Sequence, residues 1–459
     1  MATCTWDGGT DNWNDAANWN TDGATDRVPI TGDDVVINTA GATVTLDVHI
    51  GGGQTNTGLG DLTLTAGTLT TNDGSNRMLT VTGDVTITGG GLLCNSSTVS
   101  VNSFTISSGG TLSAPDASGS LTINGTKNAW SFQNNSTNFS HNNGTITQTN
   151  AGHIKSVSSN PMYNFIMNSS SSDSHEAVFR PSSGTDCVIA ANEVTVTRGI
   201  VKLNTVSNNA SMGSLTIGST GTFQASSGTT TITNEAGSGY AIEVSGTYTH
   251  NSGTLKITTD ANTLVKILDD VNHLIIEAAT ATRVYEWVNN TTVQGNLTIN
   301  AGRFAHYSPN FSLDVQGDCT INNTGILDGG SGSIELGGIK LASGSEYRAT
   351  TGTTTITNRI TGESHLWKND GGTFSHNNGT VKFNDNDHSA VKENTFYNVE
   401  VESNLGDYAV SFEAQGGGGN AFTILGNLTI TRGDFELVNA DDTCDIHGQT
   451  IINGSSNSG

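Results

Sequence analysis

The sequence predicts an all-β protein, a parallel β-helix (β-solenoid) that begins with an N-terminal cap. Three observations predict this fold: a composition that favours strands and turns, a short unit in which apolar and polar residues alternate, and longer repeats over the rest of the chain. A single β-helix can absorb 459 residues as one continuous core, so the length does not require several globular domains.

The composition favours strands joined by tight turns. The chain has 57 Gly, only 5 Pro and 13% charged residues, and Thr, Asn and Ser are abundant. Thr prefers strands, whereas Gly and Asn tolerate the positive φ angles of tight turns. No stretch of about 12 residues has apolar positions three and four apart, and none of about 18 residues is apolar throughout. We therefore expect almost no helix and no insertion into a membrane.

The charge balance is strongly acidic. There are 18 Lys and Arg against 42 Asp and Glu, which gives a formal net charge of -24. Such a surface repels phosphate backbones and anionic lipid, so nucleic acid and bare membrane are poor partners. Solubility is the simplest explanation of the charge.

A short unit recurs near the start of the chain. Its copies begin at residues 60, 83, 102 and 119, which are 23, 19 and 17 residues apart, close to one turn of a β-helix and too short for a propeller blade. Apolar and polar residues alternate within each copy, so one face points inward and the other is wet. A glycine and a second short strand often follow, as at Gly67, Gly91 and Gly110. The copies are Gly60-Asp61-Leu62-Thr63-Leu64-Thr65, Gly83-Asp84-Val85-Thr86-Ile87-Thr88, Asn102-Ser103-Phe104-Thr105-Ile106-Ser107 and Gly119-Ser120-Leu121-Thr122-Ile123-Asn124.

A longer period covers the rest of the chain. Its clearest marker is Phe139-Ser140-His141-Asn142-Asn143-Gly144-Thr145, with matching blocks at 248–254 and 374–380. An aromatic residue precedes each block by seven to nine positions: Trp130, Tyr240 and Trp367. We therefore expect an aromatic-rich cap with the first strands at 1–50, short-period coils at 51–129, and super-repeats at 130–239, 240–366 and 367–459. The third copy is incomplete, so we expect that a partner covers this end or that the chain continues beyond Gly459.

The repeated histidines are interpreted as parts of turns. Three histidines could in principle bind zinc, but these lie more than 100 residues apart in matching coils of different super-repeats. Asn-Gly and Ser-Gly pairs are typical of turns, which a neighbouring His can support by local hydrogen bonds. The residues assigned to these turns are His141, Asn143, Gly144, His250, Gly253, His376, Asn378 and Gly379.

The five cysteines are far apart, odd in number and without a C-x-x-C pair, so neither a disulfide framework nor a zinc site fits. Cys319 stands where other repeats have Leu or Val, which predicts a buried free thiol. The cysteines are Cys4, Cys94, Cys187, Cys319 and Cys444.

Acidic clusters raise the question of catalysis or calcium binding. The pairs are Asp33-Asp34, Asp269-Asp270 and Asp441-Asp442. Adjacent carboxylates on a strand point to opposite faces, so a working pair would have to come from neighbouring coils. Asp385, Asp387 and His388 form the densest cluster, and a solvated loop is the favoured interpretation. The Gly-x-Gly-x-Asp nonapeptide of calcium-bound β-rolls is missing.

No nucleophile elbow, phosphate loop or dinucleotide fingerprint is found, and Gly416-Gly417-Gly418-Gly419 is interpreted as a flexible corner. We assign no catalytic, cofactor-binding or metal-binding residue and expect no cofactor. The chain also starts without a basic and an apolar segment, so we expect no signal peptide in it.

Trp6, Trp13 and Trp19 cluster in the first 20 residues. A packed cap over the first coil is the favoured role, and stacking against a glycan is the alternative.

Two sets of residues carry a resemblance to a known group of proteins. The opening Thr5-Trp6-Asp7-Gly8-Gly9 with Gly32-Asp33-Asp34-Val35-Val36-Ile37 resembles the start of β-helical surface proteins of bacteria and their phages. The His-containing blocks, with Gly295–Ile299 and Gly426–Ile430, resemble repeats of virion-associated phage proteins. The resemblance implies a right-handed parallel β-helix outside a cell or on a particle, and it transfers no catalytic residue.

The leading hypothesis is therefore a non-enzymatic, structural component of a phage virion, such as a fibre, decoration or appendage, with host-glycan attachment as an additional role. Its partners would be other virion or surface subunits, including further copies of itself. The alternatives are a bacterial extracellular adhesin or filament protein, and a polysaccharide-degrading tailspike with lyase or hydrolase activity. The scarcity of Lys and Arg makes the catalytic groove of a tailspike harder to build.

Overall fold

The protein is a β-solenoid, which confirms the predicted fold class. The computed structural model describes residues 1–23, 25–125, 130–155, 159–181, 186–203, 208–308, 311–385, 387–393, 395–403, 409–414, 421–439 and 441–453. These residues contain no α-helix, only the short 3-10 helix η1 (Ala16–Asn18). They form two compact units, which we describe separately: unit 1 (1–228 and 245–249) and unit 2 (229–244 and 250–459). The glycine run 416–419 lies outside the described residues.

Unit 1 has two sheets. The strands of the first sheet are β1 (Thr3–Trp6), β3 (Trp19–Thr21), β4 (Asp34–Ile37), β6 (Leu62–Leu64), β8 (Leu79–Ile87), β10 (Thr98–Ile106), β12 (Ser120–Ile123), β13 (Trp130–Asn134), β15 (Thr145–Gln148), β16 (Gly152–Lys155), β17 (Met162–Asn168), β18 (Glu176–Phe179), β19 (Cys187–Leu203), β20 (Ala210–Gln224) and β23 (Thr247–Thr249). Those of the second sheet are β2 (Asp11–Asn12), β5 (Thr43–Thr45), β7 (Thr68–Thr70), β9 (Gly91–Leu93), β11 (Thr111–Ser113) and β14 (Phe139–Ser140).

Unit 2 is built in the same way. Its main strands are β21 (Thr229–Ile232), β22 (Tyr240–Val244), β24 (Thr254–Ile257), β25 (Thr263–Lys266), β26 (His273–Glu277), β27 (Val284–Trp287), β28 (Thr291–Val293), β29 (Leu297–His306), β30 (Leu313–Asp328), β31 (Ile334–Ala342), β32 (Glu346–Arg348), β33 (Thr353–Ile356), β34 (His365–Asp370), β35 (Thr373–Ser375), β36 (Thr380–Phe383), β37 (Ser389–Lys392), β39 (Asn398–Glu402), β40 (Ala409–Glu413), β42 (Leu428–Arg432), β43 (Asp434–Leu437) and β45 (Thr450–Ile452). A smaller sheet has β38 (Thr395–Phe396), β41 (Ala421–Ile424) and β44 (Thr443–Ile446).

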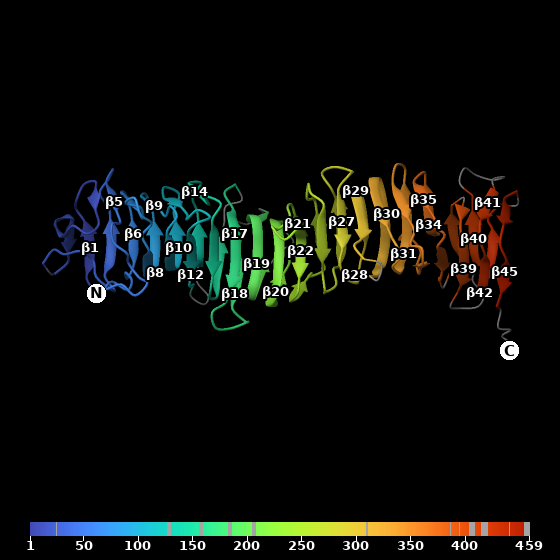
Figure 1. Ribbon diagram of the computed structural model, residues 1–459, viewed down its shortest axis with the longest axis horizontal. Coiled ribbons are helices and arrows are strands. Elements are labelled where there is room, and N and C mark those ends of the chain that lie inside the picture. Colours follow the sequence, from blue (N-terminus) through green and yellow to red (C-terminus); the bar gives the residue numbers. More distant parts are fainter. Residues whose placement is uncertain are drawn as a thin grey trace. The chain divides into compact units, whose positions relative to one another are not determined.

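Parallel pairing between successive coils creates the core. Within unit 1, β4, β6, β8 and β10 lie side by side in chain order (Figure 1). Their register places equivalent apolar residues above one another, and all are almost completely buried. One such column is Cys4, Val35, Leu62, Val85, Phe104 and Phe132. The alternation in the sequence thus becomes a continuous buried stack, the main stabilising feature of such repeats.

The cysteines belong to this core rather than to a site. All five are free thiols, and four of them are buried. Cys319 pairs in register with Leu297 on one side and Ile339 on the other, which confirms the prediction of a buried thiol in an apolar position. Burial raises the pKa of the Cys319 thiol, with a smaller contribution from Asp318, so the reactive thiolate is disfavoured.

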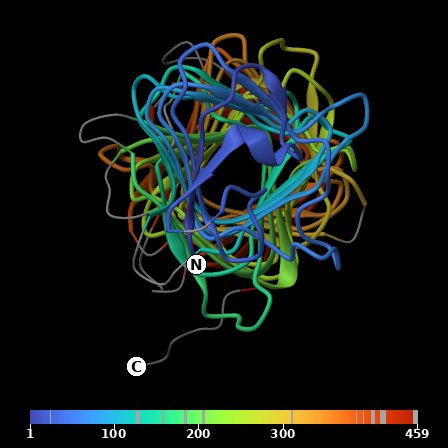
Figure 2. The same cartoon turned by 90° about the vertical axis from the view of Figure 1, so that its left-hand side faces the viewer.

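The three early tryptophans are packed inside the N-terminal end of unit 1. β3 pairs antiparallel with β1, whereas β4 pairs parallel with it. Trp6, Trp13 and Trp19 are each 0% exposed, and the Trp19 ring contacts the other two edge-on. The Trp19 indole N–H donates to the Trp13 carbonyl oxygen (2.8 Å). In Figure 2 the dark blue N-terminal segment lies in front of the blue coils of unit 1. No ring face of these three is left open for a glycan.

A ladder of side-chain acceptors marks the start of successive coils. In unit 1, Asp34 Oδ1 accepts from the Asp61 backbone N–H, and Asp61 Oδ1 accepts from that of Asp84, both at 2.8 Å. In unit 2, the Asn296 backbone N–H donates to His273 Nδ1 (2.9 Å), and Asn296 Oδ1 accepts from the backbone of Asp318 (3.0 Å). Asn398, Asn427 and Gln449 repeat the pattern. We call this arrangement the coil-start ladder.

The coil-start ladder explains the glycine in the Gly-Asp-Leu and Gly-Asn-Leu motifs. A Cβ atom on Gly83 would lie 2.1 Å from Asp61 Oδ1 and 2.8 Å from the Gly60 carbonyl oxygen. A Cβ atom on Gly317 would lie 2.4 Å from Asn296 Oδ1. Glycine is therefore needed because the preceding coil approaches closely, not because of a left-handed backbone.

The repeated His blocks form corner turns of one geometry. Asn142 and Asn143 have φ angles of 46° and 58°, and Gly144 N donates to His141 O (2.8 Å), as in a type I′ turn. The Nδ1 atom of each histidine accepts from the backbone N–H two residues on, at 2.9 to 3.1 Å. The left-handed pair is thus one residue earlier than the Asn-Gly pair suggests. Gly144 and Gly379 follow it where a Cβ atom would collide with a carbonyl oxygen. The residues assigned to these three turns from the sequence are His141, Asn143, Gly144, His250, Gly253, His376, Asn378 and Gly379.

In the structure, the aromatic marker Trp367 is not equivalent to Trp130 and Tyr240, with which it was matched in the sequence. Trp130 and Tyr240 each precede a β-bulge, and the residue at this position in the third super-repeat is His365. Trp367 instead occupies the buried position after the bulge, equivalent to Phe132. Counting along the sequence misassigned Trp367 because a residue two positions from the true equivalent is also aromatic.

Candidate functional site

A loop at residues 357–364, which we call the cleft loop, shapes the best candidate site in unit 2. Ile360 fixes this loop because its side chain is buried and its backbone N–H donates to the His365 carbonyl oxygen (2.8 Å). Gly338 lies beneath it, and a Cβ atom there would come within 2.8 Å of Ile360 N. The missing side chain at Gly338 is therefore what lets the loop approach the sheet.

Asp318 holds the middle of the cleft loop, at the residue that follows Ile360. It follows Asn296 in the coil-start ladder, and its register partner in the next coil is Gly338, which has no side-chain acceptor, so the ladder ends there. The Asp318 carboxylate instead accepts from the Thr361 backbone N–H, which is 3.2 Å from each oxygen. A ladder residue has thus become the anchor of a loop 43 residues further along the chain.

The space beside the cleft loop is a cleft of about 670 Å³, which we call the acidic cleft. Its charged lining residues are Asp318, Arg359, Glu363, Asp385 and Asp387. Arg359 forms an ion pair with Asp387 between partly exposed side chains. Asp385 is buried and accepts a hydrogen bond from the Ser389 hydroxyl. The cleft therefore contains several carboxylates whose bonds are already formed within the protein.

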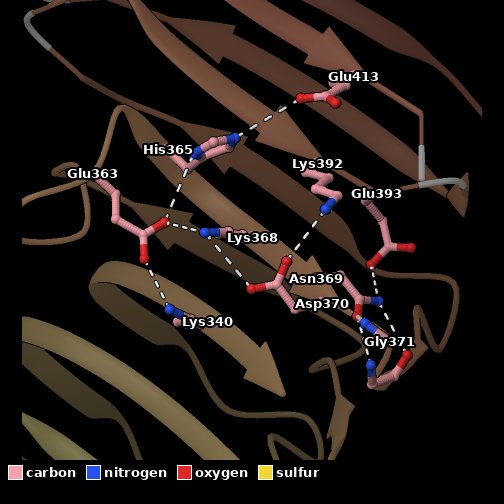
Figure 3. A network of polar contacts seen from close by, with 11 residues as sticks. Lys340, Glu363, His365, Lys368, Asn369, Asp370, Gly371, Lys392, Glu393 and Glu413 are labelled. Atoms are coloured by element: carbon pink, nitrogen blue, oxygen red, sulfur yellow. Dashed lines mark hydrogen bonds and ion pairs between the residues drawn. The ribbon is translucent and has the colours of Figure 1, made fainter. Parts of the chain in front are cut away.

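Beside the acidic cleft, three lysines form a column across neighbouring strands (Figure 3). Lys340, Lys368 and Lys392 are register partners on β31, β34 and β37. Like charges directly opposite one another destabilise a sheet unless they are compensated. Glu363 compensates the first two, with Oε1 2.8 Å from Lys340 Nζ and Oε2 2.7 Å from Lys368 Nζ. Asp370 lies 3.7 Å from Lys368 and 3.2 Å from Lys392.

His365 and Glu393 complete the polar network in Figure 3. The His365 ring lies 3.8 Å from Glu363 and 3.9 Å from Glu413, so it is bracketed by carboxylates. Glu393 is buried and accepts from the Asn369 side-chain amide (2.9 Å). It also accepts from the Trp367 indole N–H (3.3 Å), which is not drawn in Figure 3. Donors thus surround the buried Glu393 carboxylate, as burial of a charge requires.

The electrostatics of Glu363 favour binding over proton transfer. The hydrogen bonds from Lys340 and Lys368 lower the pKa of Glu363 to about 2, so this side chain is ionised at neutral pH. A general acid needs a raised pKa, close to the working pH. Fixed carboxylates and one arginine can instead accept and donate hydrogen bonds to a polar ligand. Among the described residues, no three His, Cys, Asp or Glu side chains gather closely enough to hold a metal ion.

The structure separates the acidic pairs seen in the sequence. Asp33 is buried, whereas Asp34 belongs to the coil-start ladder, so the two carboxylates do face different ways. Burial alone raises the pKa of Asp33, but hydrogen bonds from Arg27 and from the backbone of Ile30 and Ala2 outweigh it and lower the pKa to about 2. This carboxylate therefore fastens the N-terminal end of unit 1.

The other acidic clusters named from the sequence lie in turns or in the acidic cleft. Asp270 accepts from the Gln294 amide (3.0 Å), and Asp442 accepts from the Asn439 amide (2.9 Å). Asp385 and Asp387 line the cleft, a difference from the solvated loop favoured from the sequence. Their neighbour His388 instead accepts from the Ala409 backbone N–H at Nδ1 (3.2 Å).

Sequence reasoning missed Asp318, Arg359, Thr361 and Glu363. The available signal was a difference between repeats: after the Thr-rich strand, one copy continues with Glu235-Ala236-Gly237-Ser238-Gly239 and the next with Arg359-Ile360-Thr361-Gly362-Glu363-Ser364. The second segment is one residue longer and has an apolar residue that can anchor it. The partnership with Asp318 has no sequence signal because it spans two coils.

Comparisons with protein-family models, with curated proteins and with solved structures find no match to this chain. No helix in the described residues is long and apolar enough to cross a membrane.

Proposed function

We propose that this chain is a structural β-solenoid that acts as a spacer and attachment element at the outer surface of a particle or cell. The coil-start ladder is the observation that carries this proposal, because it adds side-chain bonds to the backbone pairing of consecutive coils in both units. Such coupling stiffens a repeat protein and suits a scaffold that holds binding surfaces at fixed positions.

A phage virion is the particle we favour, with the chain as a fibre, decoration or appendage protein. This part of the proposal rests on the resemblance of the opening segment and of the His-containing blocks to virion-associated β-helical proteins. Other virion subunits and further copies of the chain would be its partners. A bacterial extracellular adhesin or filament protein would use the same fold and the same acidic surface.

A polysaccharide-degrading tailspike is the second candidate, and the acidic cleft is the observation that favours it. Carboxylates from different coils do converge there, as glycoside hydrolysis requires. However, Glu363 is bonded to two lysines, Asp387 to Arg359 and Asp318 to the cleft loop. Because these carboxylates already serve bonds within the protein, non-catalytic binding remains our proposal.

Immunogold electron microscopy with antibodies against the purified chain tests the location. We expect label on the outer surface of virions released from an infected culture. Label on bacterial cells or filaments in a phage-free culture would favour the bacterial adhesin or filament protein over the virion component. Recovery of the chain only as a soluble protein that shortens polysaccharides would overturn the proposal in favour of the enzyme.

A further inference from the structure

A second cleft, of about 730 Å³, lies in unit 1 where two corners of the solenoid are expanded. Its wall includes residues 28–31, 47–50 and 54–56 and Arg77. Long loops on a rigid repeat scaffold are common places for binding sites, and this volume is typical of small-molecule sites. We call it the N-terminal cleft.

One wall of the N-terminal cleft is apolar and rigid. It consists of Val28, Pro29 and Ile30, and the Ile30 residue is 54% exposed although most large apolar residues of the chain are buried. The backbone here is fixed on both sides, because Ile30 N donates to Asp33 Oδ2 (3.0 Å) and Pro29 O accepts from the Asn56 amide (3.0 Å). The exposed Ile30 side chain can therefore pack against the apolar face of a ligand while its backbone stays in place.

The other wall combines hydrogen-bond donors and acceptors. His49 Nδ1 accepts from the Met78 backbone N–H (3.1 Å), so the neutral imidazole has its proton on Nε2 and can donate from there. Asp47 Oδ1 accepts from Asn14 N (2.9 Å), which uses one of several acceptor positions of the carboxylate. Gln54 and Asn56 add side-chain amides to the lining.

The positive charge of Arg77 at the N-terminal cleft is compensated. Arg77 donates to both oxygens of Asp73, at 3.0 Å from Nε and 2.6 Å from Nη2, so its charge is neutralised within its own loop. Asp47 adds a negative charge, and the whole chain has a net charge of -24. An anionic ligand therefore finds no unpaired cation here and a repulsive surface around it.

We propose that the N-terminal cleft binds a neutral saccharide. Each hydroxyl of a sugar both donates and accepts hydrogen bonds, which matches the Asp47 carboxylate, the His49 Nε2–H and the neighbouring amides. The C–H face of a sugar ring is apolar and packs against Ile30 and Pro29. This inference deepens the attachment role of the proposed function, and it places the contact beside the N-terminal cap instead of on the buried tryptophan rings.

Isothermal titration calorimetry with the full chain tests the site. The probes are neutral oligosaccharides of glucose, mannose, galactose and N-acetylglucosamine, with oligogalacturonate as the anionic counterpart. We expect at least one neutral probe to bind and oligogalacturonate to give no heat. Ile30→Ser should weaken binding at least tenfold, whereas the matched variant Leu268→Ser, which removes an equally exposed residue (57%) from unit 2, should leave it unchanged.

Asp47→Asn provides a second variant, because the amide oxygen can still accept from Asn14 while the charge is lost; we expect weaker binding with an unchanged circular dichroism spectrum. Binding of oligogalacturonate alone, or equal affinities of the wild type and Ile30→Ser, would overturn the proposed site. Neutral saccharide binding that survives Ile30→Ser would leave the attachment role standing and remove only this cleft. If antibodies against the chain label virions but the chain binds no saccharide, only the spacer role would remain.

Discussion

The coil-start ladder runs differently in the two units. In unit 1, each of Asp34 and Asp61 binds the backbone of the next coil, and Asp84 ends the run on the Ser103 hydroxyl (2.7 Å). In unit 2, the run from Asn296 reaches Asp318, whose register partner Gly338 has no side-chain acceptor, and the Asp318 carboxylate binds the backbone of the cleft loop. The comparison teaches that the same kind of side-chain acceptor can either bond one coil to the next or hold a loop that borders a cleft.

The largest effect is expected from the glycines of the ladder. Gly83→Ala and Gly317→Ala each place a Cβ atom against the preceding coil, so the free energy of unfolding should fall by about 2 to 3 kcal/mol from overpacking and a lost hydrogen bond. Denaturant titration followed by circular dichroism measures it. Gly9→Ala is the control, because nothing lies within 4 Å of its Cβ position. Equal midpoints for all three variants would contradict the ladder.

Acid should destabilise both units, and one carboxylate in each has a pKa that is lowered to about 2. The pKa values of Asp33 and Glu363 lie near 2 in the folded protein, below their ordinary values of 3.8 and 4.5. Their stabilisation is therefore fully present above pH about 5 and is lost as the pH falls towards about 2. Asp33→Asn should remove about 2 kcal/mol at pH 7, and Glu363→Gln about 1 kcal/mol after allowance for solvent screening.

Thermal unfolding from pH 7 to pH 2 measures these contributions. Each variant should differ most from the wild type at neutral pH and converge on it in acid. A difference that stays constant over this range would show that the carboxylate charge is not the cause.

Asp318→Ala should open the acidic cleft without unfolding the coil. The Thr361 backbone N–H loses its acceptor, so about 1 kcal/mol of local stability disappears and amide exchange at Thr361 becomes several-fold faster. Hydrogen exchange read by mass spectrometry measures this change. Asp61→Ala in unit 1 is the matched control, and it should accelerate exchange at Asp84 but not in the cleft loop.

The smallest effect is expected from Arg359→Ala. Its ion pair with Asp387 joins two side chains that are 39% and 47% exposed, and exposed pairs contribute at most about 0.5 kcal/mol. The unfolding midpoint should therefore stay within error at 150 mM salt. A loss as large as that of Gly317→Ala would mean that the acidic cleft is part of the folding core.

Features that depend on the alternation of apolar and polar residues along one strand could be predicted from the sequence. The units at 60–65 and 83–88 predicted stacked parallel strands, and the register of Leu62 with Val85 confirms them. Cys319 was predicted as a buried thiol by the same reasoning. In contrast, neither the bond from Asp61 to Asp84 nor the bond from Thr361 to Asp318 could be predicted, because each depends on which residues stand above one another in different coils.

Two local features limited the sequence interpretation further. The β-bulge before Trp367 shifts the register by one residue, so the aromatic marker of the third super-repeat was assigned to the wrong position. Asn142 and Asn143 both adopt positive φ angles, whereas the Asn-Gly pattern suggested the pair one residue later. The close approach that requires Gly144 is a contact with Pro115 of the coil before, which no local pattern reveals.

The coil-start ladder also gives assembly a direction. In the pairs from Asp34 to Asp61 and from Asp61 to Asp84, the acceptor belongs to the coil that comes first in the chain and the donor to the coil that follows. A polypeptide synthesised from its N-terminus therefore exposes each acceptor before the amide that it serves has been made. Each folded coil therefore presents its acceptors to the coil that follows, so the coils can fold in the order in which they are synthesised.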